Sequence, residues 1–155
     1  MRGRFQMSRA TPQLRSIAKR VMAHEVGGNE AAGTDHPFPV LEKLRPHLAT
    51  LMGRAGLRGL LSRSLALANE EVHWLRAVHV KSDGSLTGLQ ELQGELAPAL
   101  FFEGRTVLLA QLLGLLAVFI GEELTLQLLH GTWPKLLLND LDFGKGNRNE
   151  KKPRG

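Results

Sequence analysis

The sequence predicts a mainly α fold: a helical bundle around one central apolar helix, with a small β-hairpin. The longest apolar block runs from Ala99 to His130, and it is rich in leucine and far too long for a strand. Upstream of this block, leucines recur every three or four residues, which is the spacing of one buried helix face. A strong turn signal at Asp83 and Gly84 follows alternating valines and favours the hairpin.

The composition of the chain indicates three parts. Residues 1–38 are expected to form a basic N-terminal arm and linker, residues 39–143 the helical domain, and residues 144–155 a disordered basic tail. The segment from Gly27 to Pro39 is rich in glycine, proline and small residues, which is typical of a linker. The compact domain is therefore predicted to begin near Pro39.

A short basic amphipathic helix is predicted within the arm. Thr11 and Pro12 suit an N-cap and a first helical position, and Gly27 with Gly28 would end the helix. Its apolar residues follow helical spacing: Leu14, Ile17, Ala18, Val21 and Met22. We favour packing of this helix on the body of the fold, while docking to a partner or membrane surface, or a role as a removed targeting segment, stays open.

Two helices that form an antiparallel or angled pair are predicted upstream of the hairpin. A first apolar stripe, from Leu41 to Ala55, keeps its phase across Pro46, so we expect a helix that either kinks at this proline or begins there. Gly53 and Gly56 then loosen the chain before a second stripe. The second helix presents mostly leucine and alanine, so it lacks the exposed hydrogen-bonding side chains of a DNA-recognition helix.

The central helix follows the hairpin and one short helix. The short helix, over Leu89–Leu96, is expected to end at Pro98. The central helix is predicted over Arg105–His130, where Gly131 begins a stop signal. The last apolar piece, Trp133–Leu141, is expected to fold back over the core.

A buried helix in a soluble protein explains the central block better than a membrane span. The 15 residues from Val107 to Gly121 would cover roughly 22 Å as a helix, against a hydrocarbon thickness of about 30 Å. Charged residues flank this stretch, and each would cost about 2.5 to 3.5 kcal/mol at the centre of a bilayer. They are Glu103, Arg105, Glu122 and Glu123, of which we expect the last two to face solvent. Membrane association is therefore not expected.

Such a helix needs cover on every side, and this requirement predicts a partner. A chain of 155 residues has few other helices with which to cover it. We therefore expect a protein partner or a second copy of the chain to complete the shell. The candidate partner or dimer surface is Leu112, Leu116 and Phe119.

The charge of the chain is unevenly distributed. The formal net charge is +5, yet the middle of the chain is acidic and both ends are basic. Basic arms can bind a polyanion, so nucleic-acid association through the termini is the alternative function. The candidate polyanion-binding residues are Arg2, Arg4, Arg9, Arg15, Lys19, Arg20, Lys151 and Lys152. The arms have no interleaved aromatic residues to stack bases, which weakens the case for single-stranded nucleic acid.

The sequence contains no motif that commits it to a chemistry. It has no cysteine, which excludes disulfides and thiolate metal sites and fits a cytoplasmic setting. Glu70 and His73 have the ExxH spacing of di-iron bundles, but no second such pair exists, so neither a metal nor a cofactor is expected. The DFG at Asp142 lacks every other kinase motif. A non-catalytic role is favoured, and an enzyme whose site is assembled in space stays open.

Several segments resemble small bacterial hypothetical proteins with no assigned function. The similar segments, within about Leu41 to Lys152, are EKLRPHLATLMG, LLSRSLALA, WLRAVHVKSDGSL, FFEGRTVLLAQLLGLLAVFIGE and WPKLLLNDLDFG. The resemblance implies a bacterial, intracellular setting and no catalytic activity. The function predicted from the sequence is a helical protein–protein interaction or regulatory module in the cytoplasm.

Overall fold

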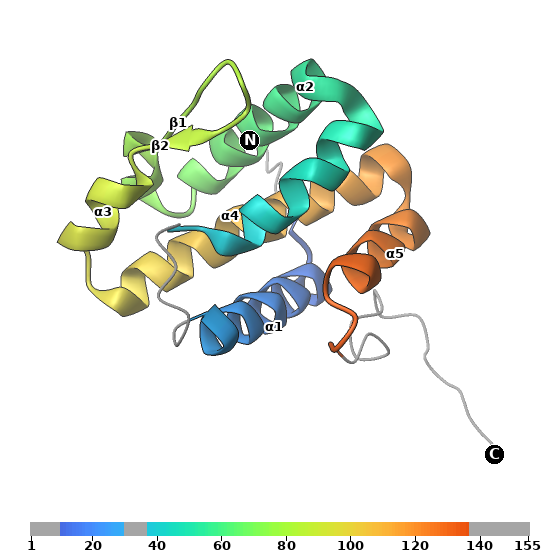
Figure 1. Ribbon diagram of the computed structural model, residues 1–155. Coiled ribbons are helices and arrows are strands. Elements are labelled where there is room, and N and C mark those ends of the chain that lie inside the picture. The colour runs from blue at the N-terminus through green and yellow to red at the C-terminus, as the bar shows by residue number, and fades with distance from the viewer. Residues whose placement is uncertain (1–9, 30–36, 137–155) are drawn as a thin grey trace, which may run out of the picture.

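The computed structural model describes residues 10–29 and 37–136 (Figure 1). In chain order the elements are α1 (Pro12–Asn29), α2 (Pro39–Asn69), the 3-10 helix η2 (His73–Ala77), β1 (His79–Val80), β2 (Leu86–Thr87), α3 (Leu89–Glu95), α4 (Pro98–Ile120) and α5 (Glu122–Thr132). The expected tail over 144–155 lies outside the described residues.

Helix α4 is the centre of the fold. The other four α-helices pack against it, and every residue from Leu108 to Leu116 is buried. Leucines on all sides of this stretch lose their contact with water, which is the main stabilising contribution of the core. The predicted class, a mainly helical bundle around one central apolar helix with a small hairpin, is confirmed.

The central helix is shorter than the sequence analysis predicts. It ends at Ile120, and Gly121 takes φ 96° and ψ 157°, a conformation that glycine adopts and side-chain-bearing residues avoid. The chain then turns back as α5, which packs on α4 and buries Thr125 and Leu129. The expectation of one helix from Arg105 to His130 is therefore wrong, because the chain reverses at a glycine inside it. The predicted stop after His130 is confirmed by the end of α5 at Thr132.

Helix α2 bends at a glycine and not at its proline. It continues through Pro46, whereas Gly53 takes φ 77° and ψ 170° and divides α2 into two angled halves (Figure 1). The angled pair is confirmed, whereas α2 neither kinks nor begins at Pro46, so both alternatives expected at this proline are wrong. The missing proline N–H removes one hydrogen bond, while the backbone angles at Gly53 redirect the whole chain.

Helix α1 packs into the same core as the rest of the chain. Its first turn is capped as predicted, because the backbone N–H of Leu14 donates to Thr11 Oγ1 at 3.2 Å. The five apolar residues predicted to share one face are all buried: Leu14, Ile17, Ala18, Val21 and Met22. Packing on the body of the fold is therefore the role that the structure shows for this helix, and the body includes residues upstream of Pro39.

The hairpin forms where the turn signal places it. Strands β1 and β2 are antiparallel, with His79 opposite Thr87 and Val80 opposite Leu86. In the turn, the backbone N–H and the hydroxyl of Ser85 donate to Asp83 Oδ1 at 2.9 and 2.6 Å. The hairpin is joined to α2 because Arg45 Nη1 donates to the carbonyl oxygen of Gly84 at 2.7 Å. This contact supports a two-stranded unit too small to be stable alone.

Candidate functional site

Four large apolar side chains remain exposed where α4 ends. Leu51 is 52% exposed, Val118 67%, Phe119 68% and Leu124 50%. They lie on three elements that meet at this point: α2 just before its bend, the last turn of α4, and the first turn of α5 (Figure 1). We call these four residues the terminal patch. Exposed large apolar residues that gather at one end of a helix are typical of interaction sites.

A groove lies beside the terminal patch, between the second half of α2 and the end of α4. Its volume is about 420 Å³, and the residues that line it are Met52, Gly56, Gly59, Leu60, Arg63, Leu115, Val118 and Phe119. We call it the glycine groove. A Cβ atom added to Gly59 would meet no atom within 4 Å, so the groove is open above this residue. The exposed ring of Phe119 forms part of its wall.

A second hollow lies on the α5 side of the patch. It has a volume of about 340 Å³, and it is lined by His47, Thr50, Leu51, Ile120, Leu124, Gln127 and Leu128. The terminal patch is therefore flanked by one concave surface toward the second half of α2 and another toward α5. Exposed apolar residues beside hollows of this kind can pack against a partner surface.

Charged side chains of both signs lie on the helices that carry the terminal patch, and among them Arg63 lines the glycine groove. Three exposed arginines lie on the second half of α2, and none has an ion-pair partner among the described residues: Arg54, Arg58 and Arg63. Glu122 and Glu123 are exposed in the first turn of α5, as the sequence predicts. The carboxylates also suit a helix N-terminus, where the helix dipole favours negative charge.

The structure places only one of the three predicted surface residues at the surface. Phe119 is exposed, whereas Leu112 is 1% exposed and Leu116 is 0% exposed. The prediction of Leu112 and Leu116 as a partner or dimer surface is therefore wrong, because α4 is covered by its neighbours within a single chain. The cover is incomplete at both ends of α4, where Leu100 near the start and Val118 and Phe119 in the last turn are exposed. Leu51 and Leu124 were missed because helical spacing assigns them to buried stripes.

The predicted polyanion-binding residues fall into two groups. Arg15 forms a bidentate ion pair with Glu71, at 2.8 and 2.7 Å, so its guanidinium is committed to an internal contact. Lys19 and Arg20 are exposed on α1. The others lie outside the described residues: Arg2, Arg4, Arg9, Lys151 and Lys152.

The pair of Arg15 and Glu71 reaches into the core through a glutamine. The amide nitrogen of Gln111, which is fully buried in α4, donates to Glu71 Oε2 at 2.7 Å. The hydrogen bond from Arg15 is the main cause that lowers the pKa of Glu71 from its usual value. The same hydrogen bond raises the pKa of Arg15. The three side chains join α1, the turn that follows α2 and the middle of α4.

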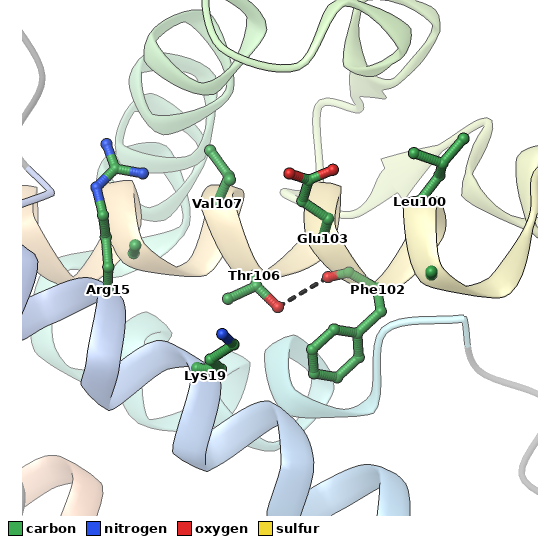
Figure 2. A pocket seen from close by; sticks show the side chains of 9 residues that line it. Arg15, Lys19, Leu100, Phe102, Glu103, Thr106 and Val107 are labelled. Atoms are coloured by element: carbon green, nitrogen blue, oxygen red, sulfur yellow. Dashed lines mark hydrogen bonds between the residues drawn. The ribbon is translucent and has the colours of Figure 1, made fainter.

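A further pocket of about 440 Å³ lies between α1 and α4 (Figure 2). Its lining is mostly apolar, and its polar members are Arg15, Lys19, Glu103 and Thr106. The Thr106 hydroxyl donates to the carbonyl oxygen of Phe102 at 2.8 Å, and Arg15 is held by Glu71. Two of the four polar groups are therefore hydrogen-bonded within the fold.

Two further features bear on ligands and membranes. Within residues 10–29 and 37–136, no three histidine, aspartate or glutamate side chains lie close enough to hold a metal ion. In the same residues α4 is the one helix long and apolar enough to cross a membrane, and 61% of its most apolar window is buried inside the protein.

Comparison of the chain with protein-family models, with curated proteins and with solved structures finds no match. Function is therefore inferred from the arrangement of this chain's own residues.

Proposed function

We propose that this protein is a non-catalytic helical interaction module that docks another protein surface on its terminal patch, in the cytoplasm. The observation that carries the proposal is the exposure of Val118 and Phe119, 67% and 68%, at the end of a helix whose middle is completely buried. Burying one such side chain contributes about 1.5 to 3 kcal/mol. A partner that covers the patch would recover this free energy.

The composition of the surface also supports a protein partner. Phenylalanine, methionine and arginine are enriched in protein interfaces, and all three line the glycine groove. An anionic membrane surface would attract Arg63 at the glycine groove but repel Glu122 and Glu123 in the first turn of α5. A protein surface can match both signs of charge.

The ionisable groups with shifted pKa values serve the fold. Burial lowers the pKa of Arg105 to about 10, and its Nη1 donates to the carbonyl oxygen of Pro37 at 2.8 Å, which holds the chain just before α2. Hydrogen bonds from Ser85 lower the pKa of Asp83 and close the hairpin turn. Neither group lies on the terminal patch, and both have a structural role that accounts for the shift. Both shifts are therefore explained by contacts within the fold.

Photo-crosslinking tests the proposal. A photoreactive amino acid at position 119, in protein produced in its native cells, should give an adduct of defined mass. Excess untagged wild-type protein should compete for this adduct, whereas the Phe119→Ser protein should not. The same amino acid at position 100 is the matched control, since Leu100 is 49% exposed near the other end of α4. Absence of any competed adduct at position 119 would refute the proposal.

A further inference from the structure

We infer that the hollow between the second half of α2, η2 and β1 binds an adenine nucleotide, either free or within a single strand of nucleic acid. Its volume is about 550 Å³, which is within the range of ligand pockets. Its polar lining residues are Ser62, Asn69, Arg76 and His79, and its apolar ones include Val78 and Val80. We call it the hairpin hollow. Among the described residues it shares none with the glycine groove, so the inference does not depend on the proposed function.

Within the described residues, the hairpin hollow is lined by Arg76 and His79 and by no carboxylate. Both side chains are exposed, and neither forms an ion pair or a hydrogen bond with another described residue. Glu70 follows Asn69 in sequence, but it lies about 100° further around the helix and does not line the hollow. A guanidinium fork and an imidazole without internal partners suit the oxygens of a phosphate group.

The amide of Asn69 has both of its hydrogen-bonding ends uncommitted. Its Oδ1 is buried without a donor, and the side chain makes no hydrogen bond within the part of the chain that the structure describes. Rotation about the Cβ–Cγ bond, whose torsional preference is broad, can turn this amide toward the hollow. Adenine presents the N6 amino donor beside the N7 acceptor, which is the pattern that an asparagine amide pairs with. Asn69 therefore selects adenine among the bases.

The apolar lining gives the base a surface to lie on. Leu65 and Val78 are buried at 6% and 2% exposure, and Val80 is half-buried. Unstacked bases lie against side chains of this kind of site through their flat faces, and arginine and histidine can stack on them. An inorganic anion would leave the apolar lining uncovered, whereas an apolar ligand would leave Arg76 unpaired. A nucleotide supplies both a flat apolar group and a phosphate.

Isothermal titration calorimetry of the full chain tests the inference, with AMP, GMP and inorganic phosphate as probes. AMP should bind saturably. GMP should bind about tenfold more weakly or worse, because guanine presents two acceptors to the amide and leaves Asn69 Oδ1 without a donor. Inorganic phosphate should also bind more weakly than AMP. An oligomer of deoxyadenylate separates the two sources of the ligand: tighter binding than AMP assigns the site to a strand, and equal binding assigns it to the free nucleotide.

Two substitutions test the roles of the lining residues. Asn69→Leu removes the amide together with a buried acceptor that has no donor, so the Tm should stay unchanged or rise while the preference for AMP over GMP is lost. Arg76→Gln should weaken both nucleotides about tenfold or more, since it removes the charge that pairs with phosphate. Lys135→Gln is the control, since it removes an exposed positive charge outside the hollow and should leave the affinity for AMP unchanged.

Three outcomes would overturn the inference. The first is the absence of saturable AMP binding, and the second is an equal affinity of the wild type for AMP and GMP. The third is an equal effect of Arg76→Gln and Lys135→Gln, because binding would then depend on positive charge anywhere on the surface. None of these results bears on crosslinking at position 119, which tests a different surface.

Discussion

The indole Nε1 of Trp133 donates a 2.6 Å hydrogen bond to Glu25 Oε2, a carboxylate that is 3% exposed. Lys43 Nζ donates to the same oxygen at 2.5 Å. The three groups come from the chain after α5, from α1 and from α2, so one buried carboxylate joins three distant segments. A buried charge is tolerated when it is paired and hydrogen-bonded in this way.

Trp133→Phe should destabilise the fold. The substitution keeps an aromatic ring but removes the N–H that Glu25 accepts from, which should lower the free energy of unfolding by about 1 to 3 kcal/mol. Urea denaturation followed by circular dichroism would measure the change. Lys43→Gln is the comparison, with a smaller expected loss because the lysine side chain is 48% exposed. Equal stability of the Trp133→Phe protein and the wild type would contradict this role.

The ion pair of Arg15 and Glu71 should make stability depend on acid pH. Folding lowers the pKa of Glu71 below its value in the unfolded chain, which is about 4.3. The stability that the ionised carboxylate contributes is therefore fully present above this pH and is lost as the pH falls through the lower pKa of the folded state. The wild type should therefore exceed Glu71→Gln in unfolding free energy at neutral pH, and the difference should shrink below about pH 4.3.

Denaturation at a series of pH values would measure this difference. Glu70→Gln is the matched control, since Glu70 is exposed and adjacent in sequence. Parallel pH profiles for the wild type and Glu71→Gln would show that the pair contributes nothing to the acid response.

Gly104→Ala should be destabilising because the added Cβ atom has no room beside Trp74. A Cβ at Gly104 would lie 2.0 Å from Cζ2 of Trp74, a ring that stacks on Phe101 with centroids 5.7 Å apart. Overpacking of this kind costs about 1 to 3 kcal/mol. Thermal unfolding would show a lower Tm, whereas Gly94→Ala, with open space around it, should raise Tm slightly. If the two alanine variants unfold at the same temperature, the close approach of Trp74 is not limiting.

Gly121→Ala should be destabilising because of backbone strain. No atom lies within 4 Å of a Cβ at this position, so the cost comes from φ 96° alone and is expected to be about 1 to 3 kcal/mol. Gly131→Ala is the control, since it has the same open space within a helix. Chemical denaturation would compare them, and equal stability of the two variants would mean that the turn adapts without strain.

The sequence predicts best those features whose cause is local. The cap at Thr11 and the turn at Asp83 depend on residues within a few positions, and both form as expected. The break between two helices near Gly53 and Gly56 was expected, whereas the chain reversal at Gly121 was not, because a glycine permits a positive φ while distant packing decides whether it is adopted. Local periodicity fixes which residues share a face and not how far a neighbouring helix covers that face.

The candidate site illustrates the same limit. Leu112 and Leu116 share the apolar pattern of Phe119, yet only Phe119 lies beyond the cover of the other helices. The burial of Glu25 also has no local signal, since its partner Trp133 lies 108 residues away.

Gln111 has a consequence for the uniqueness of this fold. A rod of leucines can rotate, or slip by one turn, against its neighbours with little loss of apolar contact, so a leucine-rich core alone would admit several nearly equivalent packings. The hydrogen bond from Gln111 to Glu71 is available in only one of them. A slip would leave the buried amide of Gln111 without the carboxylate of Glu71. The free energy cost of this loss holds the repetitive helix in a single alignment.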